Sequence, residues 1–300
     1  MRLSTSTNLY NFDRSVPYQL SMEDAMRVCR DAGYSFLDAN FCGMSRLGKK
    51  EAPMTLDDWD ERVRSWKVLA DRTGINFRQA HAFFSVKGSI TADALPDGEF
   101  GEEMMRRSVL AAEVLGVEWM VVHPVNILTD GHNDPEASFR YNLEYYGKWA
   151  EFFRTHHVGM AIENMLCGGR HNNVWADIDR LCALVDAIGR DNVGVCVDTG
   201  HANFSGYKAA DAIRKVGHRL RATHINDNHA NGVDEHVAPY MGTIDWSDVM
   251  NALREIDYAQ DFSFEIQNLT SCYPAALQPE MIRFSYRLGN YLLANEGDIG

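Results

Sequence analysis

The feature that most restricts the fold of this chain is a regular alternation of short apolar segments with longer amphipathic ones. Eight strand-like segments, rich in apolar and β-branched residues, lie near residues 3–9, 35–41, 75–82, 118–123, 158–163, 193–198, 220–226 and 261–266. Their mean spacing of roughly 35 to 40 residues is about one βα unit, as expected when the chain forms eight of them. This alternation predicts an α/β fold built on a parallel sheet.

Helix-end signals mark the segments between the predicted strands. Ser21 followed by Asp24 is typical of a helix N-terminus, and glycines are placed as helix C-caps at Gly33, Gly74, Gly116 and Gly189. The predicted helices include 21–32, 56–73, 102–115, 135–156 and 175–188. Because no linker rich in Pro, Gly or Ser interrupts this pattern, we expect one domain over residues 1–300.

Metal-competent side chains stand at the ends of six consecutive predicted strands. They are His81, His123, Glu163, Asp198, His224 and Glu265. A doubly wound open sheet would also show βα alternation, but in a closed barrel the C-terminal end of every strand opens onto one shared face. The positions of these residues therefore favour a (β/α)8 TIM barrel with a metal site at that mouth.

The chemistry of the predicted ligands restricts the metal. Glu163, Asp198, His224 and Glu265 offer carboxylate and imidazole donors without a thiolate, which favours a hard ion such as Mn²⁺ or Mg²⁺, with Co²⁺, Zn²⁺ and Fe²⁺ as alternatives. We expect one divalent ion, with Mn²⁺ first among these. Such an ion polarises a carbonyl or hydroxyl pair and stabilises an enediolate, and Glu163 and Glu265 would be the acid/base pair that transfers the proton.

Three further residues follow the same strands. His201 comes three residues after Asp198, and Asp234 and His236 lie in the segment NGVDEHVAP. We expect His201 to orient a substrate oxygen as a catalytic group. Substrate contacts are expected from His81, His123, Asp234 and His236, although His201, Asp234 and His236 could instead hold a second ion.

Several functional classes are disfavoured by the sequence. Neither G-x-G-x-x-G nor G-x-x-x-x-G-K-[ST] occurs, and there is no G-x-S-x-G, so nucleotide chemistry and serine hydrolysis are not expected. The formal net charge of −13 argues against a broad nucleic-acid-binding surface. The chain lacks a signal-peptide pattern and a long apolar run, which predicts a cytoplasmic protein without membrane contact.

Glu163 and four segments together resemble the xylose isomerase-like barrel superfamily, the sugar phosphate isomerase/epimerase and endonuclease IV group. The segments are VDTGH at 197–201, THINDN at 223–228, DEH at 234–236 and FSFEI at 262–266. The resemblance covers essentially the whole chain. It implies one divalent ion, commonly Mn, on the four strand-end ligands, proton exchange between two glutamates and a sugar or sugar derivative, and assembly into dimers or tetramers.

The resemblance leaves three activities open. The chain matches all nine ligands of the three zinc ions of endonuclease IV, at His81, His123, Glu163, Asp198, His201, His224, Asp234, His236 and Glu265. It reads DTGH where that nuclease has DTCH, and it lacks counterparts of the Arg- and Tyr-bearing DNA-penetrating loops. The arginine-bearing segment that follows the corresponding histidine in ketose 3-epimerases is also missing. We therefore expect a sugar isomerase or epimerase, ahead of a lyase on a keto-sugar, keto-inositol or glycoside and of a zinc-dependent nuclease on abasic DNA.

Overall fold

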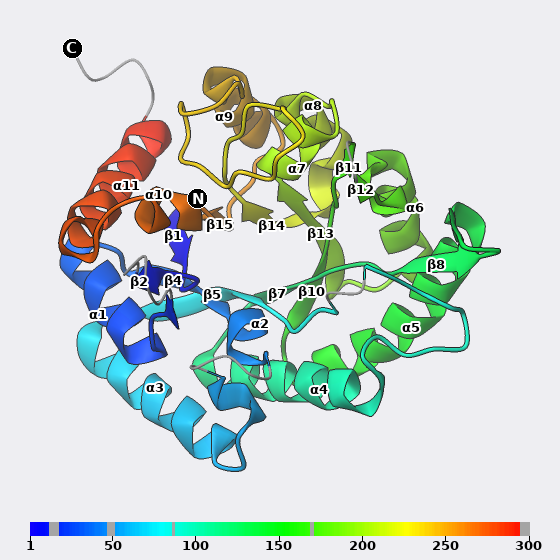
Figure 1. The fold of residues 1–300 in the computed structure, drawn as a ribbon, viewed down its shortest axis with the longest axis horizontal. Coiled ribbons are helices and arrows are strands. Elements are labelled where there is room, and N and C mark those ends of the chain that lie inside the picture. Colours follow the sequence, from blue (N-terminus) through cyan, green and yellow to red (C-terminus); the bar gives the residue numbers. More distant parts are fainter. Residues whose placement is uncertain (12–17, 47–51, 86–87, 169–170, 295–300) are drawn as a thin grey trace.

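The structure is a computed structural model that describes residues 1–11, 18–46, 52–85, 88–168 and 171–294. Eight parallel strands surround a central axis and a ring of helices lies outside them (Figure 1). The strands are β1 (Arg2–Ser6), β4 (Phe36–Asn40), β5 (Asn76–His81), β7 (Trp119–Val122), β10 (Gly159–Glu163), β13 (Val193–Asp198), β14 (Leu220–His224) and β15 (Asp261–Phe264). All eight predicted strands are confirmed, and so is the TIM-barrel fold.

The sheet closes into a barrel where β14 meets β15. Its order follows the chain, and β15 pairs in parallel with β1. Beyond the end of β14, the N–H of Ile225 donates to the carbonyl of Ser263 at 2.8 Å, and the N–H of Glu265 donates to the carbonyl of Ile225 at 3.0 Å. These bonds join β14 to β15, so every strand end opens onto one mouth.

The outer helices confirm the predicted segments. They are α1 (Met22–Ala32), α3 (Trp59–Thr73), α4 (Gly98–Leu115), α5 (Pro135–Thr155), α6 (Ile178–Ile188), α8 (Ala209–Val216), α9 (Trp246–Glu255) and α11 (Gln278–Leu293). The Ser21 hydroxyl accepts from the N–H of Asp24 at 3.2 Å, as its N-cap pattern predicts. Left-handed glycines end α1, α3, α4 and α6 at the four predicted positions.

Three predicted helix starts were wrong. The helix predicted from residue 56 begins at Trp59, because Leu56 is extended after a short 3-10 turn at residues 53–55. The helix predicted from residue 175 begins at Ile178, because the Asp177 carboxylate accepts from the N–H groups of Asp179 and Arg180 and fixes the N-terminus there. The residues before it form a short 3-10 turn, η2 (Val174–Ala176). The helix predicted from residue 102 has one further turn that begins at Gly98, where two glycines of low helix propensity conceal it in the sequence.

Shorter helices, 3-10 turns and strands lie in the loops that connect the barrel strands and outer helices. The short helices are α2 (Phe41–Met44), α7 (Thr199–Phe204) and α10 (Gln267–Ser271), and the 3-10 turns are η1 (Pro53–Thr55), η3 (Gly217–Arg219) and η4 (Ala275–Leu277). The remaining strands are β2 (Tyr10–Asn11), β3 (Tyr18–Gln19), β6 (Ser89–Ile90), β8 (Asn126–Thr129), β9 (His132–Asp134), β11 (Cys167–Gly168) and β12 (His171–Asn172). No described helix is long and apolar enough to cross a membrane.

Side chains inside the barrel form a layer directly beneath the mouth. Because successive side chains of a strand point to opposite faces, the residue two before each strand-end group faces inward as well. On one side this layer is a buried cluster of small apolar residues, Val121, Ala161, Cys196 and Ala222. On the other side Gln79 and Ser263 donate hydrogen bonds to the carboxylate of Asp38, at 2.7 Å and 3.3 Å. The mouth therefore rests on a packed floor that is polar near Asp38.

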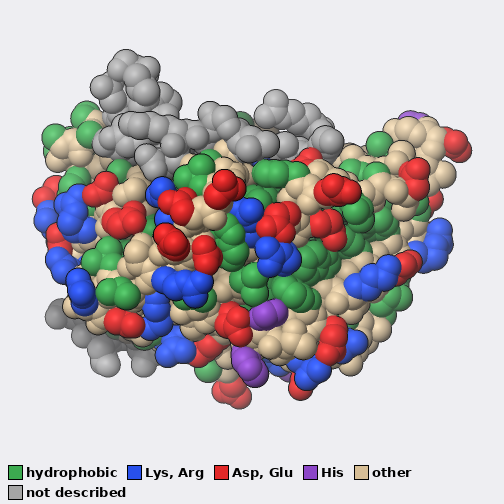
Figure 2. All heavy atoms as spheres, turned by 90° about the horizontal axis from the view of Figure 1, so that it is seen from below, with side chains coloured by type: hydrophobic (Ala, Val, Ile, Leu, Met, Phe, Trp, Pro, Cys, Tyr) green, Lys and Arg blue, Asp and Glu red, His purple; other side chains and the backbone are tan. Residues whose placement is uncertain are grey.

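The outer surface carries interspersed charges. On the face shown in Figure 2, Lys and Arg side chains lie among Asp and Glu side chains. On α3, for example, Arg64 pairs with Asp60 and Lys67 pairs with Asp71. Among the described residues of this face there is no continuous basic area of the kind that phosphate backbones require.

Candidate active site

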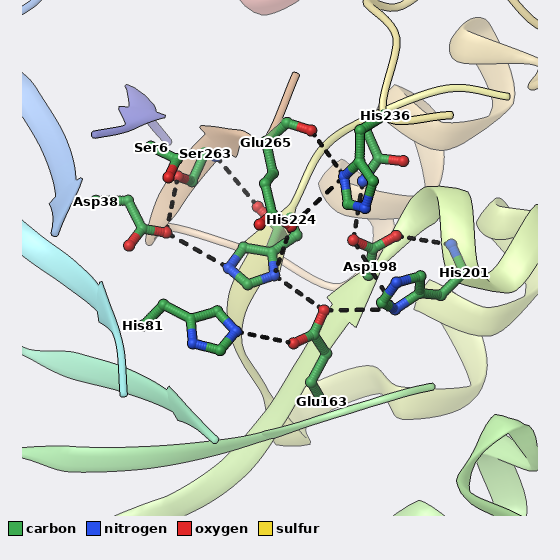
Figure 3. Close-up of polar contacts among 12 residues, drawn as sticks. Ser6, Asp38, His81, Glu163, Asp198, His201, His224, His236, Ser263 and Glu265 are labelled. Atoms are coloured by element: carbon green, nitrogen blue, oxygen red, sulfur yellow. Dashed lines mark hydrogen bonds and ion pairs between the residues drawn. The ribbon is translucent and has the colours of Figure 1, made fainter. Parts of the chain in front are cut away.

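The barrel mouth brings the predicted strand-end residues together (Figure 3). His81, Glu163, Asp198 and His224 are the last residues of β5, β10, β13 and β14, and His123 and Glu265 directly follow β7 and β15. All six face the axis and lie at the bottom of one cavity or immediately beneath it.

A group of four residues has the composition of a metal site. Glu163, Asp198, His224 and Glu265 each offer one ligand atom, and these atoms all lie within 4.8 Å of one another. Nδ1 of His224 lies 2.9 Å from Oε1 of Glu163 and 3.4 Å from Oε2 of Glu265. The two glutamates thus approach the same imidazole nitrogen from strands separated by β13 and β14.

The other predicted residues lie on either side of this group. His201, Asp234 and His236 form a second set of close ligand atoms, with His236 Nε2 3.1 Å and His201 Nε2 3.8 Å from Oδ2 of Asp234. On the opposite side, His81 and His123 place their Nε2 atoms 3.6 Å and 2.9 Å from Oε2 of Glu163. All nine residues predicted from the sequence therefore surround one space.

Local hydrogen bonds explain why Asp198 and His201 take these positions. The Asp198 carboxylate accepts from the N–H of His201 at 2.7 Å and so begins α7. Asn164 fixes both residues: its amide oxygen accepts from the N–H of Asp198 at 2.7 Å, and its carbonyl lies 2.9 Å from Nδ1 of His201. Asn226 donates to Oδ2 of Asp198 at 2.8 Å.

Gly200 is required by the packing of this segment. A Cβ atom at Gly200 would overlap the side-chain oxygen of Asn226 and would lie 3.1 Å from Nδ2 of Asn228. Because Asn226 holds Asp198, a larger residue here would displace a candidate metal ligand. The glycine of the DTGH segment is therefore a packing requirement of this chain.

We expect Gly200→Ala to lower the free energy of unfolding by about 1–3 kcal/mol, the usual cost of overpacking a buried site. Gly147→Ala is the matched control, because a Cβ there meets no atom within 4 Å and the residue lies in the interior of α5. That change should raise the free energy of unfolding by roughly 0.5–1 kcal/mol. Urea unfolding of both variants measures the difference, and equal effects would contradict the packing argument.

The sequence interpretation missed Asp38, Asn164 and Asn226. Oδ2 of Asp38 lies 3.5 Å from Nε2 of His224, on the side of the ring away from Glu163. Asn164 and Asn226 follow the ligands Glu163 and His224 by one and two residues, so their amides were a signal that sequence reasoning could have used. Asp38 lies inside a strand, and nothing in its sequence neighbourhood marks it.

The protonation equilibria of the site are strongly perturbed. Burial lowers the pKa of His224 and of His201, but the surrounding anions outweigh burial and hold both pKa values well above the usual range. Burial raises the pKa of Glu163, but His224 and His123 outweigh it and hold the pKa of that carboxyl well below its usual value. Burial also raises the pKa of Asp198 and lowers the pKa of His123 to about 4. Protonated imidazoles thus balance buried carboxylates, a role that a divalent cation can take over.

Two buried oxygen atoms support the fit of a cation to these residues. Oδ1 of Asp234 is buried without a hydrogen-bond partner among the described residues, and Oε2 of Glu163 accepts no hydrogen bond of good geometry from them although Nε2 of His123 lies 2.9 Å away. An orphaned buried carboxylate oxygen is costly unless a charge compensates it. The ligand atoms of three carboxylates and one imidazole also lie within 4.8 Å of one another. This arrangement fits a divalent ion.

The site opens into a cavity of about 710 Å³, a volume typical of small-molecule sites. Its lining combines Glu163, His201 and Glu265 with aromatic side chains and several amides, including Asn126 and Gln267. Such a lining offers hydrogen-bond partners to a small polar molecule above the carboxylates.

Comparison with known proteins identifies relatives of both kinds foreseen from the sequence. The family model described as "Xylose isomerase-like TIM barrel" matches residues 26–288. A "D-psicose 3-epimerase" of Enterocloster bolteae is 35% identical over 140 residues, which are 47% of this chain and 42% of that protein. A "Probable endonuclease 4" of Thermoplasma acidophilum is 25% identical over 239 residues, 75% of this chain and 78% of that protein. The chain spans about half the length of the first curated relatives.

Solved structures share the fold. A D-psicose 3-epimerase in the presence of D-fructose superposes with a TM-score of 0.75 at 16% identity, over 98% of this chain and 100% of that one. A protein named IOLI with a bound zinc atom superposes with a TM-score of 0.71 at 17% identity, over 97% of this chain and 98% of that one.

Proposed function

Because the chain belongs to the xylose isomerase-like TIM barrel family, we propose that it is a divalent-metal-dependent isomerase or epimerase of a sugar or sugar derivative. One observation carries the proposal: Glu163 and Glu265 approach Nδ1 of His224 from separate strands, at 2.9 Å and 3.4 Å, at the bottom of a cavity of about 710 Å³. Binding alone does not require two carboxylates so arranged, whereas removal and return of a proton does.

Glu163, Asp198, His224 and Glu265 would hold the ion, with Mn²⁺ first among the candidates. When bound, it would supply polarisation of the substrate's carbonyl and hydroxyl oxygens. One glutamate removes the proton from the carbon next to the carbonyl, and the other returns a proton to that carbon from the opposite face or to its neighbour. His201, held by Asn164, orients a substrate oxygen, and His81, His123, Asp234 and His236 contact the substrate. The relatives named as epimerases support this chemistry.

Solvent exchange tests the proposal over a range of candidate sugars. The Mn²⁺-loaded protein is incubated in D₂O with free and phosphorylated ketoses of four to six carbons, and mass spectrometry records one deuteron gained per turnover. Exchange with at least one ketose supports the proposal. Absence of exchange throughout contradicts it, and loss of water or of an aglycone would identify a lyase instead.

A zinc-dependent nuclease is the second candidate. It is favoured by the ligand group His201, Asp234 and His236 beside the first one, and by the similarity to a protein named as an endonuclease. Against it, Gly200 stands where endonuclease IV has cysteine, and no Cβ fits there without displacing Asn226. Metal analysis of the protein purified without chelator separates the candidates: about one ion per chain supports the isomerase, and three zinc ions with cleavage of abasic DNA support the nuclease.

Asp38 should act as a positioning residue for His224. A carboxylate that accepts from the second ring nitrogen of a metal-binding histidine fixes its orientation, and its loss typically weakens metal binding 10- to 100-fold. We expect Asp38→Asn to raise the Kd for Mn²⁺ by about that factor in calorimetric titration. Asp261→Asn is the matched control, because Asp261 is equally buried but pairs with Arg2 at the other end of the barrel. Equal Kd values for wild type and Asp38→Asn would refute this role.

A further inference from the structure

The cavity contains one cationic side chain whose role the proposed proton transfer does not explain. Among the described residues that line it, Arg46 is the only Lys or Arg. It follows α2 in the loop after β4, and therefore lies at the mouth of the barrel. A cation that faces a substrate cavity needs an anionic partner or an exposed position to be stable.

Contacts with described residues hold Arg46 in place, and none of these residues is an anion that would neutralise its charge. The guanidinium carbon lies 4.7 Å from the centre of the Phe84 ring, and Nη2 donates to Sγ of Cys42 at 2.9 Å. Burial raises the pKa of the Cys42 thiol to about 11, so the sulfur is neutral. Among the described residues, the side-chain contacts of Arg46 are with Cys42 and Phe84, and no ion pair joins it to a carboxylate. Arg46 therefore presents a preoriented guanidinium to the cavity, and no carboxylate of the described residues balances its charge.

A chain of contacts links Arg46 to the proposed proton-transfer site. The Phe84 ring that supports the guanidinium also stacks on His123, with ring centres 4.0 Å apart. His123 in turn contacts Glu163 at 2.9 Å. The cation and the proton-transfer site are thus connected by two stacked aromatic rings, and all of these residues line the same cavity.

We propose that Arg46, supported by Phe84, forms an anion-binding subsite, and that the substrate is a ketose with a carboxylate or phosphate at the end remote from its carbonyl. This inference rests on the proposed function, because the reacting end of the ketose is placed at Glu163 and Glu265. A guanidinium binds either anion through two parallel N–H···O bonds, and Arg is preferred to Lys for such recognition. The segment that follows His224, INDNHANGVD at 225–234, contains no arginine, so Arg46 supplies the cation from another loop, the one that follows α2.

Calorimetric titration of the Mn²⁺-loaded protein with matched ligands tests the subsite. The ligands are D-erythrulose, D-ribulose and D-fructose, their terminal phosphate esters, and the corresponding terminal carboxylates. We expect at least one anionic member to bind about 10- to 100-fold more tightly than its neutral counterpart, the range of a charged hydrogen-bonded pair. A preference for the ester identifies a sugar phosphate, and a preference for the carboxylate identifies a sugar acid; either supports the subsite.

The variant Arg46→Gln should reduce this preference to about one, whereas Arg46→Lys should retain part of it because it keeps the charge. Arg254→Gln, which removes a surface guanidinium that donates to Asn251, should leave the preference intact. No anionic preference in the wild type, or a preference that survives in Arg46→Gln, would overturn the inference. The solvent-exchange experiment tests the proposed function separately. If an anionic ligand binds through Arg46 but no ketose exchanges a proton, the anion subsite is supported and the isomerase activity is contradicted.

Discussion

Replacement of Glu265 by glutamine is expected to slow proton exchange between substrate and solvent by about 10²- to 10⁴-fold, the usual contribution of a positioned general acid or base. Glutamine has the size of glutamate but cannot accept the proton. The backbone of Glu265 is held independently of its side chain, because its N–H donates to Ile225 and its carbonyl lies 3.1 Å from Nδ1 of His236. The variant should therefore fold, and the loss should be in kcat. Deuterium incorporation from D₂O at saturating ketose measures it.

Two controls separate loss of the base from loss of the metal or of the fold. Glu144→Gln removes a carboxylate whose side chain is 74% exposed on α5 and pairs with Lys148, so its exchange rate should equal that of the wild type. Metal content of Glu265→Gln at excess Mn²⁺ shows whether the ion is retained. A metal-loaded Glu265→Gln protein that exchanges within tenfold of the wild type would remove Glu265 from the acid/base pair.

The barrel and the cluster at its mouth could be predicted because they depend on features that recur in the sequence. Most strands are short segments rich in apolar or β-branched residues, and a residue able to bind metal marks the end of six of the eight. Once the sheet closes, these ends must converge. The strand predicted over 3–9 ends early, at Ser6, because its hydroxyl accepts from the N–H of Asn8 and turns the chain. The pattern of apolar residues does not indicate such a local hydrogen bond, so it could not predict where this strand ends.

The residues that sequence reasoning missed depend on contacts across the barrel. Asp38 meets His224 only because β4 and β14 face each other inside the closed sheet. Arg46 follows a short helix with no periodic pattern, and its importance comes from facing the same cavity as Glu163. In both cases no motif or spacing in the surrounding sequence marks the residue as functional, and only its position in the folded barrel does.

Removal of the metal is expected to abolish solvent exchange and to destabilise the fold together, because the proposed ion would both activate the substrate and compensate the buried carboxylates of the folded barrel. A ligand that binds only the folded state contributes about 2.7 kcal/mol at a free concentration one hundred times its Kd. For a chain of this size that corresponds to a Tm lower by roughly 5 °C in chelator than in excess Mn²⁺. Differential scanning calorimetry and exchange assays after dialysis against chelator, and again after return of Mn²⁺, measure both effects.

The variant Asp198→Asn tests whether the stabilisation by Mn²⁺ depends on the proposed metal ligands. Its amide oxygen can still accept from the N–H of His201 and begin α7, and the amide of Asn226, which donates to the other oxygen of Asp198, can turn to accept from the new amide nitrogen. The variant should therefore fold, but it removes a buried negative charge from the proposed metal ligands. We expect its Tm to respond little to Mn²⁺, whereas Glu144→Gln should respond like the wild type. A wild-type Tm that is the same in chelator and in Mn²⁺, with exchange activity retained, would mean that the buried carboxylates are balanced by protonated His201 and His224 alone and that the chemistry proceeds without a metal.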